Sequence, residues 1–546
     1  MAISSALLDV QNLTIKTVSG SPLVNNISFQ VNRREMVALV GESGSGKTLS
    51  SLSLIGLLPG GLDMEAGSIS LNGKIIASSG QPFAASARGK QLGMIFQEPM
   101  TSMNPVLKVG EQIAEVLVRH KKISWRQAYR EAVALLDRVG ILEPERRAKQ
   151  YIHQLSGGMR QRVMIASAIS CKPLLLIADE PTTALDVTIQ AQILSLLQDL
   201  QNEMDMGVLL ITHDLSLVAR YADRACVMHQ GNIVEQGNVQ QLLTQPQQPY
   251  TQKLIAASQP APRNKEVFDA GETGRATPLI RLFALTKSYP QAQRLPFIAA
   301  KRQTVLFPTT LDIHRGEILG LIGESGSGKT TLGRAIIGLI EADSGKIEFD
   351  GILLNGANTA TRHKMRRRAQ IIFQDPYASL NPKITVGEQI AEPLRVYKLR
   401  EPAKITARVE ELLTLVGLEA HHASRLPSAF SGGQRQRIAI ARALALEPEL
   451  LVADEAVSAL DLSVRGQVLA LLDNLRHRLG LTVLFISHDL AAVKQVCDRV
   501  VVLYHGKIVE TGETNQVLIA PRHAYTQQLI AAAPDITQAL RLRKAS

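Results

Sequence analysis

Short, uninterrupted apolar runs recur along the chain, and several of them end directly before a polar or glycine-rich segment. Such runs are shorter than an ordinary helix, and apolar character at every position is typical of strands that are covered on both faces of a parallel sheet. They occupy residues 36–40, 174–178 and 208–212 in the first half, and 318–322, 450–453 and 483–487 in the second. The pattern predicts an α/β fold with a mainly parallel core sheet in each half.

Between these strands the apolar positions follow a different spacing, which is typical of helices. Residues 125–139 are rich in Ala, Leu, Arg and Glu, most of which are strong helix formers, and they lie in the segment between Gln97 and Ser156. We therefore predict that a helical subdomain is inserted into the α/β core of each half.

The chain repeats itself. Residues 41–48 read Gly-Glu-Ser-Gly-Ser-Gly-Lys-Thr, and the same sequence returns at 323–330. From Ser156 onward, matching positions of the two repeats keep one constant offset, whereas the offset is larger at the first glycine, as expected for insertions in surface loops. Proline, glycine and polar residues without periodicity mark a linker. We expect a first domain at 1–257, a linker at 258–278 and a second domain at 279–546.

The repeated glycine-rich segment has the pattern of a phosphate-binding loop. In Gly-x-x-x-x-Gly-Lys-Thr after a strand, backbone N–H groups surround phosphates, the lysine holds the β- and γ-phosphates, and the threonine hydroxyl binds Mg²⁺. The predicted ligands are therefore ATP and Mg²⁺. The candidate residues are Gly41, Ser43, Gly44, Gly46, Lys47 and Thr48 in the first repeat, and Gly323, Ser325, Gly326, Gly328, Lys329 and Thr330 in the second.

A second motif follows the apolar strands at 174–178 and 450–453, both of which run into the pair Asp-Glu. An aspartate at the carboxyl end of a strand beside a phosphate loop can hold Mg²⁺. The glutamate that comes next can polarise the attacking water as a general base. The pairs Asp179 and Glu180, and Asp454 and Glu455, therefore predict ATP hydrolysis at two sites.

Two further motifs keep the same order and the same spacing in both repeats. Ser-Gly-Gly-x-Arg-Gln-Arg precedes Asp-Glu, and a histidine follows the glutamate further along the chain. Together with the phosphate loops, this set resembles the ABC ATPases, and the resemblance covers nearly the whole chain. In that family two such domains dimerise head to tail, and each ATP lies between the phosphate loop of one and the Ser-Gly-Gly element of the other. That element opens a helix, whose N-terminal amides suit an anion.

The resemblance implies a role for each matching residue and an intrachain pseudo-dimer of the two ATPase domains. Glu180, His213, Glu455 and His488 would be catalytic, with the histidines holding the γ-phosphate. Gln97 and Gln374 would contact Mg²⁺ together with Thr48, Asp179, Thr330 and Asp454, and would report its presence to the transport partner. ATP would also be contacted by Ser156, Gly157, Gly158, Ser431, Gly432 and Gly433, and Asp186 and Asp461 would bridge the two sites.

The two sites are expected to differ at the adenine. Aligning the first strands of the repeats sets Thr17 opposite Tyr289, where the family places an aromatic ring that stacks on the base. Only the second repeat supplies that ring. The stretch from this position to the phosphate loop is longer in the second repeat than in the first, which leaves open that the alignment is wrong and another side chain covers the base.

The subfamily is indicated by segments that follow the glutamines and the final strands. Residues 96–105 and 373–382 resemble the coupling loops of dipeptide, oligopeptide and nickel importers, and 249–254 and 524–529 resemble a C-terminal element of the same group. Fused members include glutathione and microcin C importer ATPases. The resemblance implies that the chain energises import of peptides or peptide-like solutes at the cytoplasmic face of the inner membrane. Its partners would be two transmembrane permease subunits and, indirectly, an extracytoplasmic solute-binding protein.

Charge and composition leave alternatives open. Lys plus Arg total 60 against 49 Asp plus Glu, and a net charge of +11 is compatible with a twin-ATPase factor that acts on ribosomes or DNA. A nickel or metallophore importer is a second alternative. The short, proline-rich linker and the absence of zinc-type cysteine spacing favour the peptide-class importer, with no nucleic acid as partner. No run approaches about 18 apolar residues, so the membrane-spanning subunits are expected to be other chains.

Overall fold

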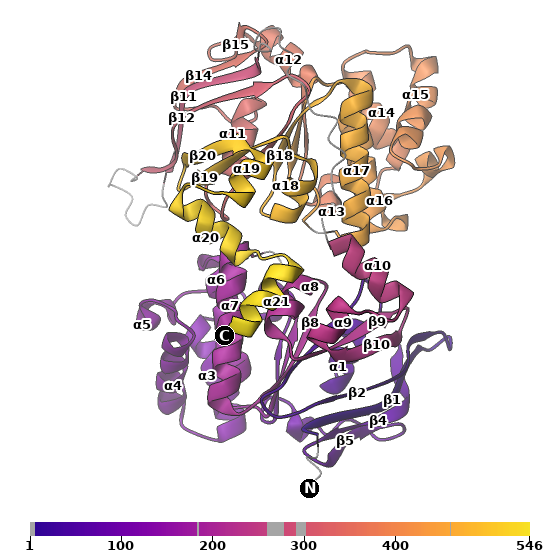
Figure 1. Cartoon of the computed structure of the whole chain (residues 1–546), viewed down its shortest axis with the longest axis vertical. Coiled ribbons are helices and arrows are strands. Elements are labelled where there is room, and N and C mark those ends of the chain that lie inside the picture. Colours follow the sequence, from indigo (N-terminus) through magenta and orange to yellow (C-terminus); the bar gives the residue numbers. More distant parts are fainter. Residues whose placement is uncertain (1–5, 183–184, 259–277, 291–301, 459, 546) are drawn as a thin grey trace. The chain divides into compact units, whose positions relative to one another are not determined.

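The computed structural model describes residues 6–182, 185–258, 278–290, 302–458 and 460–545. The chain divides into two compact units, the first formed by Met1–Gln259 together with Pro534–Ser546 and the second by Pro260–Ala533 (Figure 1). The units thus differ from the predicted domains at the C-terminal end, where residues 534–546 belong to the first unit. The predicted linker at 258–278 lies, apart from its two end residues, outside the described parts of the chain.

The core of the first unit is a six-stranded sheet in the order β10-β9-β3-β8-β7-β6. All neighbouring strands are parallel except β10, which pairs antiparallel with β9 at one edge. The strands are β3 (Met36–Val40), β6 (Leu92–Ile95), β7 (Leu175–Asp179), β8 (Gly207–Thr212), β9 (Arg224–His229) and β10 (Asn232–Asn238). Every residue of β3, β7 and β8 is buried, which explains the uninterrupted apolar runs and confirms the predicted parallel core.

The second unit repeats this sheet, in the order β16-β17-β18-β13-β19-β20. The strands are β13 (Ile318–Ile322), β16 (Ala369–Ile372), β17 (Leu450–Asp454), β18 (Thr482–Ile486), β19 (Arg499–Tyr504) and β20 (Lys507–Glu513). Two apolar cores lie on its opposite faces: Ile318 and Ile322 belong to one, and Leu319 and Leu321 to the other. Alternate residues of one strand therefore fill different cores, so that every position is apolar.

A second, antiparallel sheet covers part of each unit. Its order is β2-β1-β4-β5 in the first unit and β12-β11-β14-β15 in the second. The strands are β1 (Leu8–Thr17), β2 (Pro22–Val31), β4 (Leu62–Leu71), β5 (Lys74–Ser78), β11 (Pro278–Pro290), β12 (Arg302–His314), β14 (Ser344–Phe349) and β15 (Ile352–Leu353). These strands have one face toward solvent, so their apolar residues alternate with polar ones and do not form the runs that mark the parallel sheets.

Helices cover the parallel sheets and build the predicted helical subdomains. In the first unit they are α1 (Lys47–Leu54), α2 (Pro99–Ser102), α3 (Val109–Lys121), α4 (Trp125–Arg138), α5 (Pro144–Arg147), α6 (Gly157–Ile169), α7 (Val187–Met204), α8 (Leu215–Tyr221), α9 (Val239–Thr244), α10 (Pro249–Ser258) and α21 (Ile536–Ala545). In the second they are α11 (Lys329–Ile336), α12 (Thr359–Arg368), α13 (Pro376–Ser379), α14 (Val386–Val396), α15 (Pro402–Leu415), α16 (Gly432–Leu444), α17 (Leu462–Leu479), α18 (Leu490–Val496), α19 (Thr514–Ile519) and α20 (Ala524–Ala532). Helices α2 to α6, and α13 to α16, lie between the glutamine and Asp-Glu motifs, where the insertion was predicted. Within the described ranges, no helix combines the length and apolar character needed to cross a membrane.

Candidate active sites

The two phosphate loops connect a central strand to a helix, β3 to α1 in the first unit and β13 to α11 in the second. Gly41 has φ +156°, and a Cβ there would lie 2.2 Å from the carbonyl oxygen of Met228. Gly323 is in the same position, with φ +149° and a Cβ at 2.2 Å from the carbonyl oxygen of Leu503. Glycine is therefore required where each loop turns past the neighbouring strand β9 or β19.

The lysine of each loop is buried and hydrogen-bonded to the loop itself. Lys47 Nζ donates to the carbonyl oxygens of Gly41 and Glu42, each at 2.8 Å. Lys329 Nζ makes the same bonds to Gly323 and Glu324, also at 2.8 Å. These contacts hold both ammonium groups inside the turn of the loop, from which a lysine can reach the β- and γ-phosphates of a nucleotide.

Oxygen atoms that could bind a cation lie at the carboxyl ends of β7 and β17, close to the threonines of the phosphate loops. Thr330 Oγ1 donates to Asp454 Oδ1 at 2.9 Å, and Thr48 Oγ1 lies 3.5 Å from Asp179 Oδ1. Burial, together with the charge of Glu180, raises the pKa of Asp179 to about 6, and burial likewise raises the pKa of Asp454. A buried carboxylate with a raised pKa favours a nearby cation, and hydroxyl and carboxylate oxygens are suitable Mg²⁺ ligands.

The fit to Mg²⁺ relies on the nucleotide as well as the protein. Within the described residues, no group of three or more His, Cys, Asp and Glu side chains is placed to hold a metal ion. Mg²⁺ is typically bound by one or two carboxylates together with substrate phosphates. The residues present therefore fit a metal ion that arrives with ATP.

The structure brings the glutamine, glutamate and histidine of each repeat together. Gln97 Nε2 donates to Glu180 Oε2 at 2.9 Å, and His213 Nδ1 lies 3.1 Å from Glu180 Oε1. In the second unit, Gln374 Nε2 donates to Glu455 Oε2 at 2.7 Å, and Nδ1 of its histidine lies 3.4 Å from Glu455 Oε1. In each unit, one glutamate is thus contacted by two side chains that come from two other loops.

Two properties of the glutamates matter for their chemistry. Both have left-handed backbones, with φ 44° at Glu180 and φ 48° at Glu455, an uncommon conformation for a residue with a side chain. Although burial acts to raise it, the pKa of Glu455 is lowered by the hydrogen bond and charge of His488. A carboxylate that remains ionised can accept a proton from water, which is the requirement for a general base.

The Ser-Gly-Gly elements open α6 and α16. Ser431 Oγ accepts a hydrogen bond from the Gln434 amide at 3.4 Å, and the Gln434 side chain accepts one from the Ser431 amide at 3.0 Å. A Cβ at Gly158 would lie 2.8 Å from Ile189, and one at Gly433 would lie 2.2 Å from Val464. The second glycine therefore lets the helix start close against α7 or α17. Contact of these elements with ATP stays a prediction.

Asp186 and Asp461 stand at the N-terminal caps of α7 and α17. Asp186 Oδ1 accepts a hydrogen bond from the Ile189 amide at 3.0 Å, so its side chain stabilises the first turn of α7. The bridging role that the family resemblance implies for both aspartates stays a prediction.

The first strands of the two units have the same register, which bears on the adenine position. Leu13 pairs with Ile27 and Lys16 with Pro22 in β1 and β2. The matching residues of β11 pair with Thr309 and Thr304 of β12, so the register changes by the same amount between the two pairs in each unit. Asn12 and Ala284 occupy matching positions in β1 and β11, and each has a left-handed backbone, with φ 51° and 46°. Thr17 and Tyr289 therefore occupy matching positions, and the longer spacing in the second repeat arises between Tyr289 and the start of β12. Tyr289 is 39% exposed, so its ring is accessible.

The structure adds one residue to each site that the sequence motifs did not assign. The amide of Glu42 in the first phosphate loop donates to the hydroxyl of Tyr250 at 3.3 Å, and Glu324 donates to Tyr525 at 2.9 Å. The rings stack on His229 and Tyr504, with centroid distances of 3.9 and 4.0 Å. The signal in the sequence was the Tyr-Thr pair, which recurs in the second repeat at the same offset as the Ser-Gly-Gly element.

Comparison with known proteins agrees with this geometry. The ABC transporter family matches residues 24–183 and 306–458, and the family described as oligopeptide/dipeptide transporter, C-terminal region, matches residues 234–280 and 509–546. The two segments that match the C-terminal region family contain Tyr250 and Tyr525, the tyrosines that contact the phosphate loops. Both families occur twice, as the repeat predicts.

Curated relatives align along nearly the entire chain. The glutathione import ATP-binding protein GsiA of Salmonella choleraesuis is 47% identical over 94% of this chain and 86% of its own length. The proteins of the same name from Pectobacterium atrosepticum and Escherichia coli O6:H1 are 45% and 46% identical over 98% and 97% of this chain, and 91% and 89% of their lengths. These findings support the importer interpretation over a factor that acts on ribosomes or DNA. The chain therefore belongs to the ABC transporter family, as an ATP-hydrolysing subunit of the oligopeptide and dipeptide class with two cassettes in one polypeptide.

Proposed function

We propose that this chain hydrolyses ATP at two sites to drive import of peptide-like solutes, including glutathione-like tripeptides, through two permease subunits at the cytoplasmic face of the inner membrane. The observation that carries the proposal is the set of Gln, Glu and His side chains that meets beside each phosphate loop, together with apolar residues exposed just beyond each glutamine. The first feature serves hydrolysis, and the second offers a surface for a permease.

In each unit the glutamate is the group that acts on water. Glu180 and Glu455 would accept the proton of the attacking water, and His213 and His488 orient these carboxylates through their Nδ1 contacts. The Lys47 and Lys329 ammonium groups and the loop amides would bind the phosphates. Thr48 and Asp179, with their counterparts Thr330 and Asp454, would hold Mg²⁺, which would neutralise charge on the β- and γ-phosphates.

The segments after the glutamines expose apolar side chains. Met100 and Val106 are 40% and 74% exposed in the first unit, and Tyr377 and Ile384 are 59% and 37% exposed in the second. Met100 and Tyr377 occupy matching positions of the two repeats, and exposed apolar groups at matching positions fit docking of a partner protein. Two such surfaces on one chain favour two permease subunits.

The second of these surfaces is linked to the Ser-Gly-Gly helix. The guanidinium of Arg435, in the first turn of α16, lies 4.0 Å from the ring centroid of Tyr377. Movement of a permease segment bound at Tyr377 would therefore be transmitted to the start of α16, and through Gln374 to Glu455. Such movement would couple solute transport to hydrolysis.

The proposal is tested by recovering partners from membranes with the intact chain as bait. We expect two permease subunits, and a marked loss of recovery with Met100→Ser combined with Tyr377→Ser. Leu142→Ser is the matched control, because Leu142 is an exposed apolar residue, 83% exposed, outside these segments. Recovery of ribosomes or DNA without a permease would refute the proposal.

The solute class is tested with the assembled transporter and its binding protein in vesicles. Glutathione and short peptides should stimulate ATP hydrolysis, whereas a nickel chelate should not. Stimulation by the nickel chelate alone would replace the peptide-class assignment by the metal-import one.

A further inference from the structure

The last helix of the chain belongs to the unit formed by the first repeat. Pro534–Ser546 groups with Met1–Gln259, although it follows the second repeat in sequence. In Figure 1, α21 (yellow) lies against α8, and the two helices are in contact. Helix α8 begins at Leu215, just after the candidate catalytic His213. The C-terminal helix therefore packs on an element that leads directly from the first hydrolytic site.

Helix α21 docks through a narrow face. Its first turn is stabilised by Asp535 Oδ1, which accepts a hydrogen bond from the Gln538 amide at 2.8 Å. Ile536 and Ala539 are 6% and 0% exposed, and Arg543 follows on the same side at helical spacing. Arg541 points away from this face and is exposed. The docked face thus includes two buried apolar side chains and one cation.

The cation completes a polar cluster at the end of α8. Arg543 Nη2 lies 2.6 Å from Asp223 Oδ1, and Arg543 Nη1 donates to the carbonyl oxygen of Ala222. Asp223 Oδ2 in turn accepts a hydrogen bond from the Met36 amide at 2.9 Å. Met36 is the first residue of β3, the strand that runs into the phosphate loop. Asp223 therefore connects the C-terminal helix to the strand that carries the first nucleotide site.

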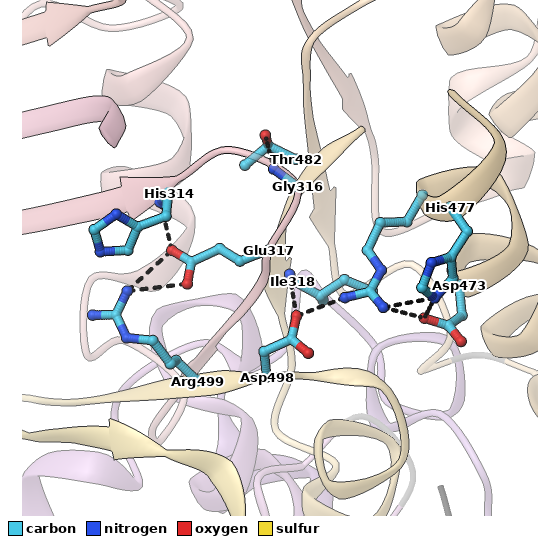
Figure 2. A network of polar contacts seen from close by, with 10 residues as sticks. His314, Gly316, Glu317, Ile318, Asp473, His477, Thr482, Asp498 and Arg499 are labelled. Carbon is cyan, nitrogen blue, oxygen red and sulfur yellow. Dashed lines mark hydrogen bonds and ion pairs between the residues drawn. The ribbon is translucent and has the colours of Figure 1, made fainter. Parts of the chain in front are cut away.

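The second unit builds the same cluster from its own residues. Asp498, which matches Asp223 in the alignment of the repeats, accepts a hydrogen bond from the Ile318 amide at 2.8 Å (Figure 2). Its cation is Arg476 of α17, whose Nη1 lies 2.7 Å from Asp498 Oδ2. The residue that matches Arg476 in the first unit is Gln201 of α7, which has no charge. The first unit thus lacks this arginine on α7, and α21 supplies one.

We propose that α21 acts as an intramolecular clasp: its contacts with α8 and Asp223 stabilise the first nucleotide site and not the second. The surface formed by α8 and Asp223 takes the C-terminal helix of the same chain, and charge complementarity selects it, because the matching aspartate of the second unit already has Arg476. The clasp holds the start of β3 and α8 in place. The proposal concerns the fold around the site and does not depend on the solute or the permeases.

Hydrogen exchange tests the clasp independently of transport. It is measured without nucleotide, on the full-length chain and on its variants. Removal of residues 534–546 should speed exchange of the α8 amides and of the Met36 amide by about tenfold or more, and Arg543→Ala by about two- to threefold, as expected for a partly exposed ion pair. Exchange in α18 of the second unit should not change. Arg541→Ala, on the exposed face of the same helix, is the matched control and should have no effect.

A rescue variant separates the ion pair from a general loss of stability. Adding Gln201→Arg to Arg543→Ala supplies the cation in the way that the second unit does, and should restore exchange at Met36 to within about twofold of the original. Unchanged α8 exchange after truncation, or equal acceleration in α18, would overturn the proposal. Protection of α8 that depends on protein concentration would also overturn it, because the occupant would then be the helix of a second copy.

The dependence of the nucleotide site is measured by titration. In the Lys329→Ala background, truncation after Ala533 should weaken nucleotide binding by about threefold, whereas in the Lys47→Ala background it should have no effect. Equal changes in both backgrounds would refute the asymmetry even if the helix docks as described.

Discussion

The hydroxyl groups of Tyr250 and Tyr525 are expected to strengthen nucleotide binding by holding the first turn of each phosphate loop. Replacing either tyrosine by phenylalanine removes the acceptor of a loop amide and keeps the ring that stacks on His229 or Tyr504. A neutral hydrogen bond contributes about 0.5–1.5 kcal/mol, and about 1.4 kcal/mol corresponds to tenfold in affinity. The loss in nucleotide affinity should therefore lie between about twofold and tenfold.

The two positions are expected to differ in magnitude. The bond from Glu324 to Tyr525 is 2.9 Å long and the bond from Glu42 to Tyr250 is 3.3 Å, so the second is the weaker. We expect about a fivefold loss for Tyr525→Phe and about twofold for Tyr250→Phe.

The assay is a titration of each site in a background where the lysine of the other site is replaced by alanine. Tyr525→Ala serves as a comparison, because it also removes the stacked ring and should cost more than the phenylalanine variant. Thermal unfolding of each variant checks that the unit remains folded. An unchanged affinity for Tyr525→Phe in a folded protein would refute the anchoring role and leave the tyrosine as a packing residue.

Three further predictions concern the hydrolytic groups and the adenine. Replacing Glu180 and Glu455 together by glutamine should leave ATP binding intact and slow phosphate release by about 10²–10⁴-fold, and near-normal release would remove them from the catalytic set. Burial and the neighbouring carboxylate raise the pKa of Asp179 to about 6. Protonation of Asp179 below that pH should therefore weaken Mg²⁺-dependent binding at the first site by about tenfold per pH unit. A binding affinity that stays constant between about pH 5 and 7 would contradict this. Thr17→Tyr should tighten the first site by about tenfold and Tyr289→Thr should loosen the second, because stacking on a base is worth about 1–3 kcal/mol; no change in either would show that the ring is irrelevant.

The parallel sheets were predictable from the sequence because burial on both faces leaves a continuous signal. The run 36–40 became β3 with the predicted bounds, and 174–178 became β7 with a small shift toward the Asp-Glu pair. The antiparallel sheets were not predicted, although a first strand that includes Thr17 or Tyr289 was expected in each repeat. Their strands have one solvated face and bulges such as the one at Asn12, which break the alternation of apolar residues.

The candidate sites were predictable as single motifs and less so as an arrangement. The sequence does not show that Gln97 and His213 contact the same carboxylate, because they lie on loops far apart along the chain. The contact of Arg543 with Asp223 joins residues 320 positions apart. Nothing local to either residue indicates this contact, and the comparison with Arg476 and Gln201 becomes informative only once the cluster around Asp498 is known.

The division of the chain into units has a consequence for the order in which it folds during synthesis. Residues 260–533 form the second unit and stand between the two parts of the first. A ribosome adds about 5–20 residues per second, so roughly 15–55 s pass between the end of the first repeat and the emergence of α21. Throughout this interval Arg543, which contacts Asp223 in the folded chain, has not yet emerged from the ribosome. The second unit, with Arg476 beside Asp498 in its own segment, can complete its polar cluster before the first unit does.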